Sequence, residues 1–154
     1  MDNPTQTVDV DWLNWLILPG ENTTLYTAIV DGGTVGLNGR GATGTYGSWV
    51  IAENGQAMYG EQRIPLAGTT NQEAECRIVL VCLDAIEARG LKGVEIASDS
   101  EWTVKAVSGE HKKLKAQHLI PLVKEIRERL VANNARLVWL GKHARGGAYQ
   151  LLGH

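Results

Sequence analysis

Between residues 25 and 64 the apolar residues gather in short runs that are separated by glycine-rich or turn-forming stretches, a pattern typical of β-strands. The run 25–30 is rich in β-branched and aromatic residues, and the glycine-rich stretch 32–44 that follows is predicted to be a loop. Two further runs, 46–52 and 56–64, flank Asn54-Gly55, which is a strong hairpin signal. The sequence therefore predicts an antiparallel meander of three strands.

From residue 69 onward the apolar positions take on helical spacing. A helix is expected to begin at the capping residues Thr69, Thr70 and Asn71, to carry Glu73 and Glu75 in its first turn, and to end at Gly90. Its apolar stripe consists of Ile78, Val79, Cys82, Leu83 and Ile86. Beyond it, the pattern predicts strands at 94–97 and 136–140 and helices at 100–107 and 119–130.

Three antiparallel strands followed by helix, strand, helix and strand indicate an α/β fold. Helical crossovers require the last two strands to run parallel to their neighbours, so we expect a mixed five-stranded sheet with helices on both faces. The length of 154 residues suits one domain, assigned to residues 23–154. Residues 1–22 are interpreted as an N-terminal extension, in which Trp12, Leu13, Trp15 and Leu16 have helical spacing.

Composition narrows the function classes. The net charge of -2 excludes binding of nucleic acid through a general positive field, so any phosphate contact must come from a local basic patch or from bound metal. Cys76 and Cys82 fit neither a zinc motif nor a disulfide framework and are expected to be reduced. No apolar run approaches the roughly 20 residues that span a bilayer, and the acidic start of the chain does not resemble a signal peptide. These features favour a cytoplasmic protein with no membrane contact.

Three carboxylates are the strongest candidates for chemistry. Asp31 is expected to end the first strand, Asp99 the fourth, and Glu75 to open the helix between them. If the first and fourth strands are neighbours, the three side chains meet at one edge of the sheet. Three such anions repel one another unless a cation joins them, and oxygen ligands select Mg²⁺ or Mn²⁺. Taken singly, each acid has an ordinary alternative, as a turn residue, a helix cap or a first-turn acid that favours the helix dipole.

Four segments in the same order resemble type 1 ribonuclease H. They are Asp31-Gly32-Gly33 with Gly44-Thr45-Tyr46-Gly47-Ser48-Trp49, then Thr69-Thr70-Asn71-Gln72-Glu73-Ala74-Glu75, Ser98-Asp99-Ser100-Glu101-Trp102 and Val138-Trp139-Leu140-Gly141-Lys142-His143-Ala144. The resemblance covers residues 25–144 and implies a ribonuclease H-like fold.

The resemblance also implies roles for individual residues. It implies Asp31, Glu75 and Asp99 as ligands of one or two Mg²⁺ or Mn²⁺ ions, with the backbone of Gly32 as a further candidate ligand. It implies that Asn71 and Gln72 contact the minor groove of a hybrid, although Asn71 could instead serve only as a helix cap. His143 resembles a histidine that assists water activation or product release, and Asn38 is a candidate contact to the substrate backbone.

The sequence departs from that family in two places. Where the family carries a fourth acidic ligand this chain has Gly153, and no Asp or Glu follows Glu128. Three explanations stay open: a truncated C-terminus, a neutral substitute such as His154, or an impaired enzyme that keeps the fold. In place of a long basic protrusion there is only a short turn, whose Lys112, Lys113 and Lys115 are either solvated or bind phosphates.

The leading hypothesis is an endonuclease that hydrolyses the RNA strand of RNA–DNA hybrids and leaves 5′-phosphate ends. The alternatives are a catalytically impaired hybrid-binding module and another nuclease of the same superfamily. The protein is taken as a monomer whose partner is the hybrid.

Overall fold

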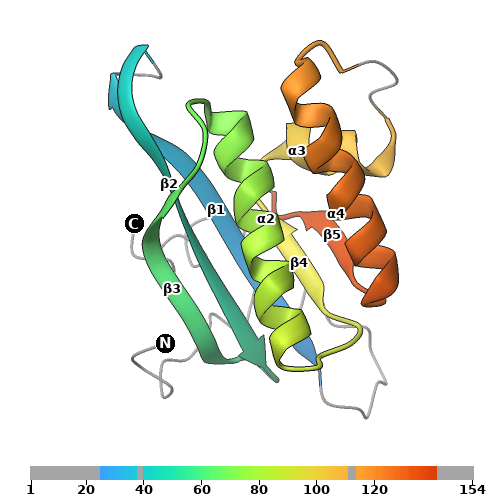
Figure 1. Ribbon diagram of the computed structural model, residues 1–154. Coiled ribbons are helices and arrows are strands. Elements are labelled where there is room, and N and C mark those ends of the chain that lie inside the picture. The colour runs from blue at the N-terminus through green and yellow to red at the C-terminus, as the bar shows by residue number, and fades with distance from the viewer. Residues whose placement is uncertain (1–24, 38–39, 111–113, 142–154) are drawn as a thin grey trace.

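The computed structural model describes residues 25–37, 40–110 and 114–141, which form a mixed five-stranded sheet with three α-helices (Figure 1). The strand order across the sheet is β3-β2-β1-β4-β5. The strands are β1 Tyr26–Leu37, β2 Arg40–Glu53, β3 Gln56–Leu66, β4 Glu95–Ser98 and β5 Arg136–Trp139. The α-helices are α2 Asn71–Ala88, α3 Glu101–Ser108 and α4 Ile120–Ala132, and a short 3-10 turn, η1 Gln117–Leu119, precedes α4.

Strand β1 lies at the centre of the sheet and joins its antiparallel and parallel halves. It pairs antiparallel with β2, where Val30 lies opposite Trp49, and parallel with β4, where Val30 lies opposite Ser98. Strands β4 and β5 are also parallel. The mixed α/β sheet expected from the sequence is therefore confirmed, including the change from antiparallel to parallel pairing at β1.

The hairpin of β1 and β2 is longer than the sequence predicted, and the prediction of a glycine-rich loop over 32–44 was wrong. Strand β1 continues to Leu37 and β2 begins at Arg40, with Gly32 opposite Gly47 and Thr34 opposite Thr45. Glycine weakens a strand but can still donate and accept the ladder hydrogen bonds. Continuous hydrogen bonding between two adjacent strands thus outweighs the local preference of the glycines for loop conformations.

Helix α2 begins with a capping arrangement that the sequence only partly resolved. Thr70 is the N-cap and accepts a hydrogen bond from the backbone N–H of Glu73, while Glu73 Oε1 accepts one from the N–H of Thr69. Asn71 is therefore the first helical residue rather than the cap. Glu75 lies one residue beyond the first turn, so its expected place in that turn was wrong by a fraction of a turn.

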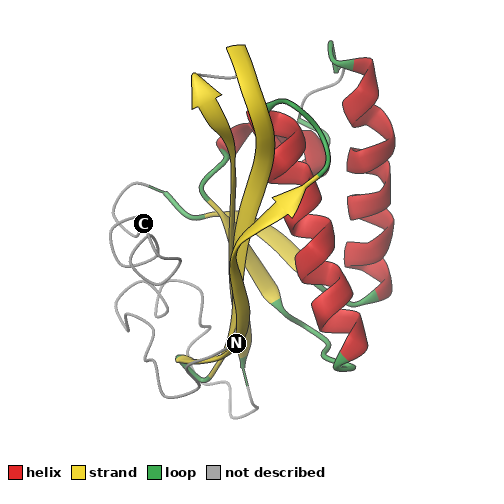
Figure 2. Ribbon diagram, turned by 60° about the vertical axis from the view of Figure 1, so that its left-hand side comes forward, coloured by secondary structure: helices red, strands yellow, loops and turns green. Residues whose placement is uncertain are grey.

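The described helices lie on one side of the sheet (Figure 2). Helix α2 packs across β1 and β2, and α4 packs beside α2 over the parallel half. Buried residues of α2 and α4 meet alternate residues of β1, β2 and β4 in one core that includes Val30, Ile51, Ile78, Leu83, Ile96 and Ile126. Within the described ranges no helix covers the opposite face, so the expected second helical layer stays a prediction.

Helices α2 and α4 are also joined by a polar network at their outer surface. The guanidinium of Arg129 on α4 contacts Asp84 and Glu87 of α2, with Nη2–oxygen distances of 2.6 and 2.8 Å. Asn133 Nδ2 also donates a hydrogen bond to Glu87, at 2.8 Å. Hydrogen bonds from Arg129 and Asn133 hold the pKa of Glu87 below its usual value. The network fixes the spacing of the two helices around the apolar core.

Both cysteines belong to the core. Cys76 and Cys82 are free thiols, and burial raises the pKa of each to about 12. Such thiols are protonated and weakly reactive at neutral pH. Among the described helices, none is both long and apolar enough to cross a membrane.

Close packing of β2 against α2 makes a prediction for Gly47. A Cβ at this position would lie 2.7 Å from Ile78 Cδ1 and 2.9 Å from Leu66 Cδ1. Gly47→Ala is therefore expected to lower the free energy of unfolding by about 1–3 kcal/mol, the usual cost of overpacking a core. Urea denaturation measures this loss. Gly44→Ala, on the same strand but with no atom within 4 Å of the new Cβ, is the matched control and should cost little. Equal losses in the two variants would contradict the packing argument.

Candidate metal centre

Two of the three candidate carboxylates lie where the parallel pairing of β1 and β4 stops. The last paired residues are Val30 and Ser98, and Asp31 and Asp99 directly follow them. Asp99 lies just beyond β4, as the sequence suggested. Asp31 does not end its strand, because β1 continues in its pairing with β2, where Asp31 lies opposite Ser48. The two aspartates are nevertheless neighbours, because β1 and β4 are adjacent and in register.

Glu75 reaches the same place because α2 comes unusually close to β1 at Gly32. A Cβ on Gly32 would lie 2.6 Å from the carbonyl carbon and oxygen of Ala74 and 2.8 Å from the nitrogen of Glu75. These are backbone atoms, which cannot move aside as the end of a side chain can. The backbone N–H of Gly32 donates a hydrogen bond to Glu75 Oε1 at 3.2 Å. A residue without a side chain is thus required for the helix to deliver its carboxylate.

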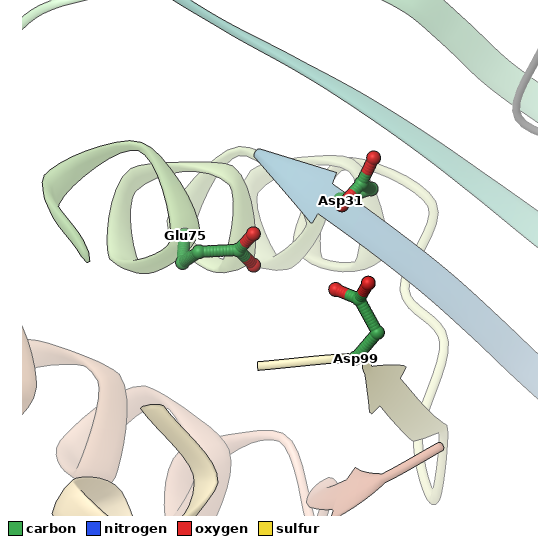
Figure 3. Close-up of side chains that lie close together, drawn as sticks. All are labelled: Asp31, Glu75 and Asp99. Atoms are coloured by element: carbon green, nitrogen blue, oxygen red, sulfur yellow. The ribbon is translucent and has the colours of Figure 1, made fainter. Parts of the chain in front are cut away.

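The three side chains converge on a common space between β1, β4 and α2 (Figure 3). Asp31, Glu75 and Asp99 each offer a carboxylate oxygen, and these oxygens all lie within 4.8 Å of one another. Asp31 and Glu75 are both only 8% exposed, whereas Asp99 is half-buried. The cluster is therefore partly enclosed, with Asp99 on its more open side.

Electrostatics in this cluster oppose ionisation of Glu75. Burial of its carboxyl group and the nearby charges of Asp31 and Asp99 raise the pKa of Glu75 well above its ordinary value. The N–H of Gly32 and the neighbouring Ser98 offset only part of this effect. An acid held in this way is costly to ionise alone, and a bound cation would remove that cost.

The donor set fits a hard divalent cation. Glu75 Oε2 is buried and has no hydrogen-bond partner among the described groups, and a bound cation would satisfy such an acceptor. Three carboxylates supply oxygen ligands only, which favour Mg²⁺ or Mn²⁺ over softer metals. The cluster of three acids is therefore compatible with binding of a divalent metal ion.

The other candidates separate into described and undescribed residues. Asn71 and Gln72 are exposed at the start of α2, one turn before Glu75, and Lys115 is exposed ahead of α4. The other predicted residues lie outside the described part of the chain. They are Asn38, Lys112, Lys113, His143 and His154. The extension 1–22 also lies outside the described residues.

Sequence reasoning missed two contributors to this centre. Ser98 sits beside Glu75, although the motif around Asp99 drew attention only to the acid. Gly32 was expected at most as a backbone ligand, whereas its described roles are to admit α2 and to donate to Glu75. The Gly-Gly pair after Asp31 was visible, but nothing local indicated which element approaches it.

Comparison with known proteins shows which family this chain belongs to. A family model described as reverse transcriptase-like matches residues 30–140. The chain belongs to the reverse transcriptase-like family. The fold of the chain is that of the RNase H structures that it resembles.

Solved structures agree with this family in fold. LC11-RNase H1, isolated from compost by a metagenomic approach, matches with a TM-score of 0.70 and 22% identity over 84% of this chain and 93% of that one. The same enzyme in complex with an RNA/DNA hybrid matches with a TM-score of 0.67 and 21% identity, covering 82% and 92% of the chains. RNase H1 from the archaeon Halobacterium salinarum matches with a TM-score of 0.64 and 21% identity, over 73% of this chain and 82% of that one. At these identities the likeness establishes the fold of this reverse transcriptase-like protein.

The raised pKa of Glu75 predicts how stability depends on pH without metal. The folded state binds this proton more tightly than the unfolded chain, so the contribution is fully present below the ordinary pKa of 4.5 and is lost as pH rises through the folded-state pKa. In the presence of a chelator, Glu75→Gln should therefore become more stable than the wild type as pH rises toward neutrality. Calorimetric melting temperatures across this range test it, with the exposed Glu110→Gln as the control. Parallel curves for Glu75→Gln and wild type would contradict the assignment.

The close approach at Gly32 makes a second prediction. Gly32→Ala should displace the start of α2 from β1, lower stability by about 1–3 kcal/mol, and separate Glu75 from the two aspartates. Titration calorimetry with Mn²⁺ should then show an affinity at least about tenfold weaker, equivalent to about 1.4 kcal/mol. Gly44→Ala, which meets no atom within 4 Å, should bind Mn²⁺ as the wild type does. Unchanged Mn²⁺ affinity in a folded Gly32→Ala protein would remove Gly32 from this role.

Proposed function

We propose that this protein is a metal-dependent endonuclease that hydrolyses the RNA strand of RNA–DNA hybrids and leaves 5′-phosphate ends. The observation that carries the proposal is the meeting of three carboxylates within 4.8 Å in an RNase H-like domain. A structural role for these acids would not account for their mutual proximity. Repulsion between them lowers stability, and burial of Glu75 adds to that cost.

Asp31, Glu75 and Asp99 would hold one or two Mg²⁺ or Mn²⁺ ions. When bound, such ions activate a water molecule and stabilise the leaving 3′-oxygen of a phosphodiester. The contribution of the chain is to orient the ligands before substrate arrives: Gly32 fixes Glu75 through its N–H, and the end of the β1–β4 pairing fixes the two aspartates. Without a cation, the three carboxylates would repel the phosphate backbone.

Selection of a hybrid is assigned to the start of α2. Asn71 and Gln72 are exposed and lie about one helical turn, roughly 5 Å along the axis, before Glu75. Amide side chains there can donate to and accept from the 2′-hydroxyls and base edges of a wide minor groove. The solved complex of LC11-RNase H1 with an RNA/DNA hybrid supports this choice of substrate. Lys115, together with Asn38, Lys112 and Lys113, is proposed to contact phosphates.

A second ion would need a further ligand beside the three carboxylates. Residues 129–154 contain no Asp or Glu, so a fourth ligand drawn from them would be neutral, such as His154, and the carbonyl oxygen of Gly32 is another candidate. A neutral ligand favours Mn²⁺, which accepts nitrogen more readily than Mg²⁺. His143 is proposed to assist water activation or product release. This same absence of acids supports the second candidate function, a hybrid-binding module with impaired catalysis.

Cleavage of a hybrid with labelled RNA tests the enzyme directly. Asp99→Asn should lower the cleavage rate by about 100-fold or more, because losing a metal ligand costs several kcal/mol of transition-state stabilisation. Affinity for the hybrid should change little. Glu110→Gln, which removes an exposed carboxylate elsewhere, is the control and should retain full activity.

The products and the metal dependence distinguish the alternatives. RNA fragments with 5′-phosphate ends, formed only with Mg²⁺ or Mn²⁺, would support the proposal. Hybrid binding without cleavage in either ion would favour the binding module. Cleavage in the presence of a chelator, or full activity of Asp99→Asn, would reject the proposed role of the carboxylates.

A further inference from the structure

A bulge in the edge strand β3 holds Arg63 in an unusual backbone conformation. The register between β2 and β3 passes from Trp49 opposite Glu61 to Gly47 opposite Ile64, so Gln62 and Arg63 both lie across from Ser48. Arg63 has a φ of +52°, in the left-handed region that side chains disfavour. Its N–H donates a hydrogen bond to Ser48 Oγ at 2.9 Å, which stabilises this conformation. Strained positions and bulges concentrate at functional sites, where they redirect a side chain.

The bulge directs the guanidinium of Arg63 over the aromatic ring of Tyr46. The guanidinium carbon lies 4.7 Å from the ring centre, a distance at which the cation is attracted to the π face. Arg63 is exposed, Tyr46 is half-buried, and no described carboxylate forms an ion pair with Arg63. Stacking limits the rotation of the planar group while leaving its N–H donors accessible to a ligand.

The register places this pair beside the carboxylate cluster. Tyr46 lies opposite Gly33, and a Cβ on Gly33 would be only 3.0 Å from the Tyr46 hydroxyl. Asp31 lies opposite Ser48, two residues earlier on the same strand. Positions two apart on a strand project to the same face and are about 7 Å apart. The Tyr46–Gly33 pair is therefore the immediate neighbour of the Asp31–Ser48 pair.

A second arginine, Arg89, also lies over a tyrosine ring, but its surroundings differ from those of Arg63. Arg89 lies 4.1 Å from the ring centre of Tyr59, but its Nη1 donates to the carbonyl of Ala85. It also lines a cavity of about 460 Å³ together with the acids Glu61 and Asp84. Arg89 thus donates a hydrogen bond to its own helix and shares a cavity with two acids, whereas Arg63 has no described acid as a partner.

We propose that Arg63, held over Tyr46 by the β3 bulge, binds the nucleic-acid backbone phosphate next to the one that lies at Asp31, Glu75 and Asp99. The inference rests on the proposed function. Three carboxylates repel the phosphates that flank the reacting one, and a fixed guanidinium one nucleotide away offsets that repulsion. Guanidinium binds phosphate through two parallel N–H donors, and stacking keeps its plane in one orientation.

The test measures hybrid affinity as a function of salt in the Asp99→Asn background, where cleavage does not interfere. Loss of one phosphate contact by Arg63→Gln should weaken binding about five- to tenfold at low salt and reduce the slope of log K against log salt by about one. Arg89→Gln, which removes the same stacked group elsewhere, should leave both quantities unchanged. Arg63→Lys keeps the charge and should retain the slope.

A neutral methylphosphonate, scanned along each strand of the hybrid, locates the contact. When the methylphosphonate stands at one position next to the scissile phosphate, it should weaken hybrid binding about fivefold for the protein that has Arg63. The same methylphosphonate should not weaken binding further for the Arg63→Gln variant. Arg63→Gly, which adopts a positive φ freely, should behave as Arg63→Gln does and remain at least as stable. It therefore excludes a folding defect as the cause.

The outcomes separate this inference from the proposed function. Hybrid binding by Asp99→Asn with the same affinity and slope in Arg63→Gln overturns the role of Arg63 and leaves the nuclease proposal standing. A wild-type protein that binds the hybrid and never cleaves it overturns the nuclease and leaves Arg63 as a phosphate contact. Equal effects of Arg63→Gln and Arg89→Gln also overturn the inference, because they would reflect general charge.

Discussion

The contact between Gly32 and the peptide linking Ala74 to Glu75 is the constraint on which the site depends. It sets how closely α2 approaches the central strand, and no side chain can be accommodated there without moving backbone atoms. The same approach lets the Gly32 N–H bond to Glu75 and brings that carboxylate to two aspartates carried by neighbouring strands. Because Gly32 has no side chain, α2 can approach β1 closely enough for Glu75 to join the two aspartates in one cluster.

That centre is electrostatically unfavourable in the bare protein, and the rest of the fold holds it together. Glu75 is buried beside two other acids, with one buried oxygen unpartnered among the described groups. The apolar core beneath α2 fixes the helix, and Arg129 ties α2 to α4 at the far surface through Asp84 and Glu87. Stability supplied by these contacts allows the acids to remain close together. A cation would then reduce the repulsion that the fold sustains.

The extended β1–β2 hairpin adds a second level of organisation beside the acids. Because β1 continues beyond Asp31, its next residue on the same face, Gly33, pairs with Tyr46. The bulge in β3 then brings Arg63 onto Tyr46. Asp31 and the Arg63–Tyr46 pair therefore lie on the same face of the sheet, with the positive group near the acids.

The sequence by itself determined the order of the elements, and it singled out the three acids that the fold brings together. Hydrophobic spacing, the Asn54-Gly55 turn and Gly90 are local signals, and local signals suffice to place most strands and helices to within a few residues. Tertiary structure alone decided that β1 runs through its glycines, that Glu75 is buried, and that Arg63 lies over Tyr46. Each of these depends on strand register or on packing between distant segments, as with Gly32 and Glu75, which are 43 residues apart. Periodicity along the chain carries no information about such contacts, because it does not specify which faces meet.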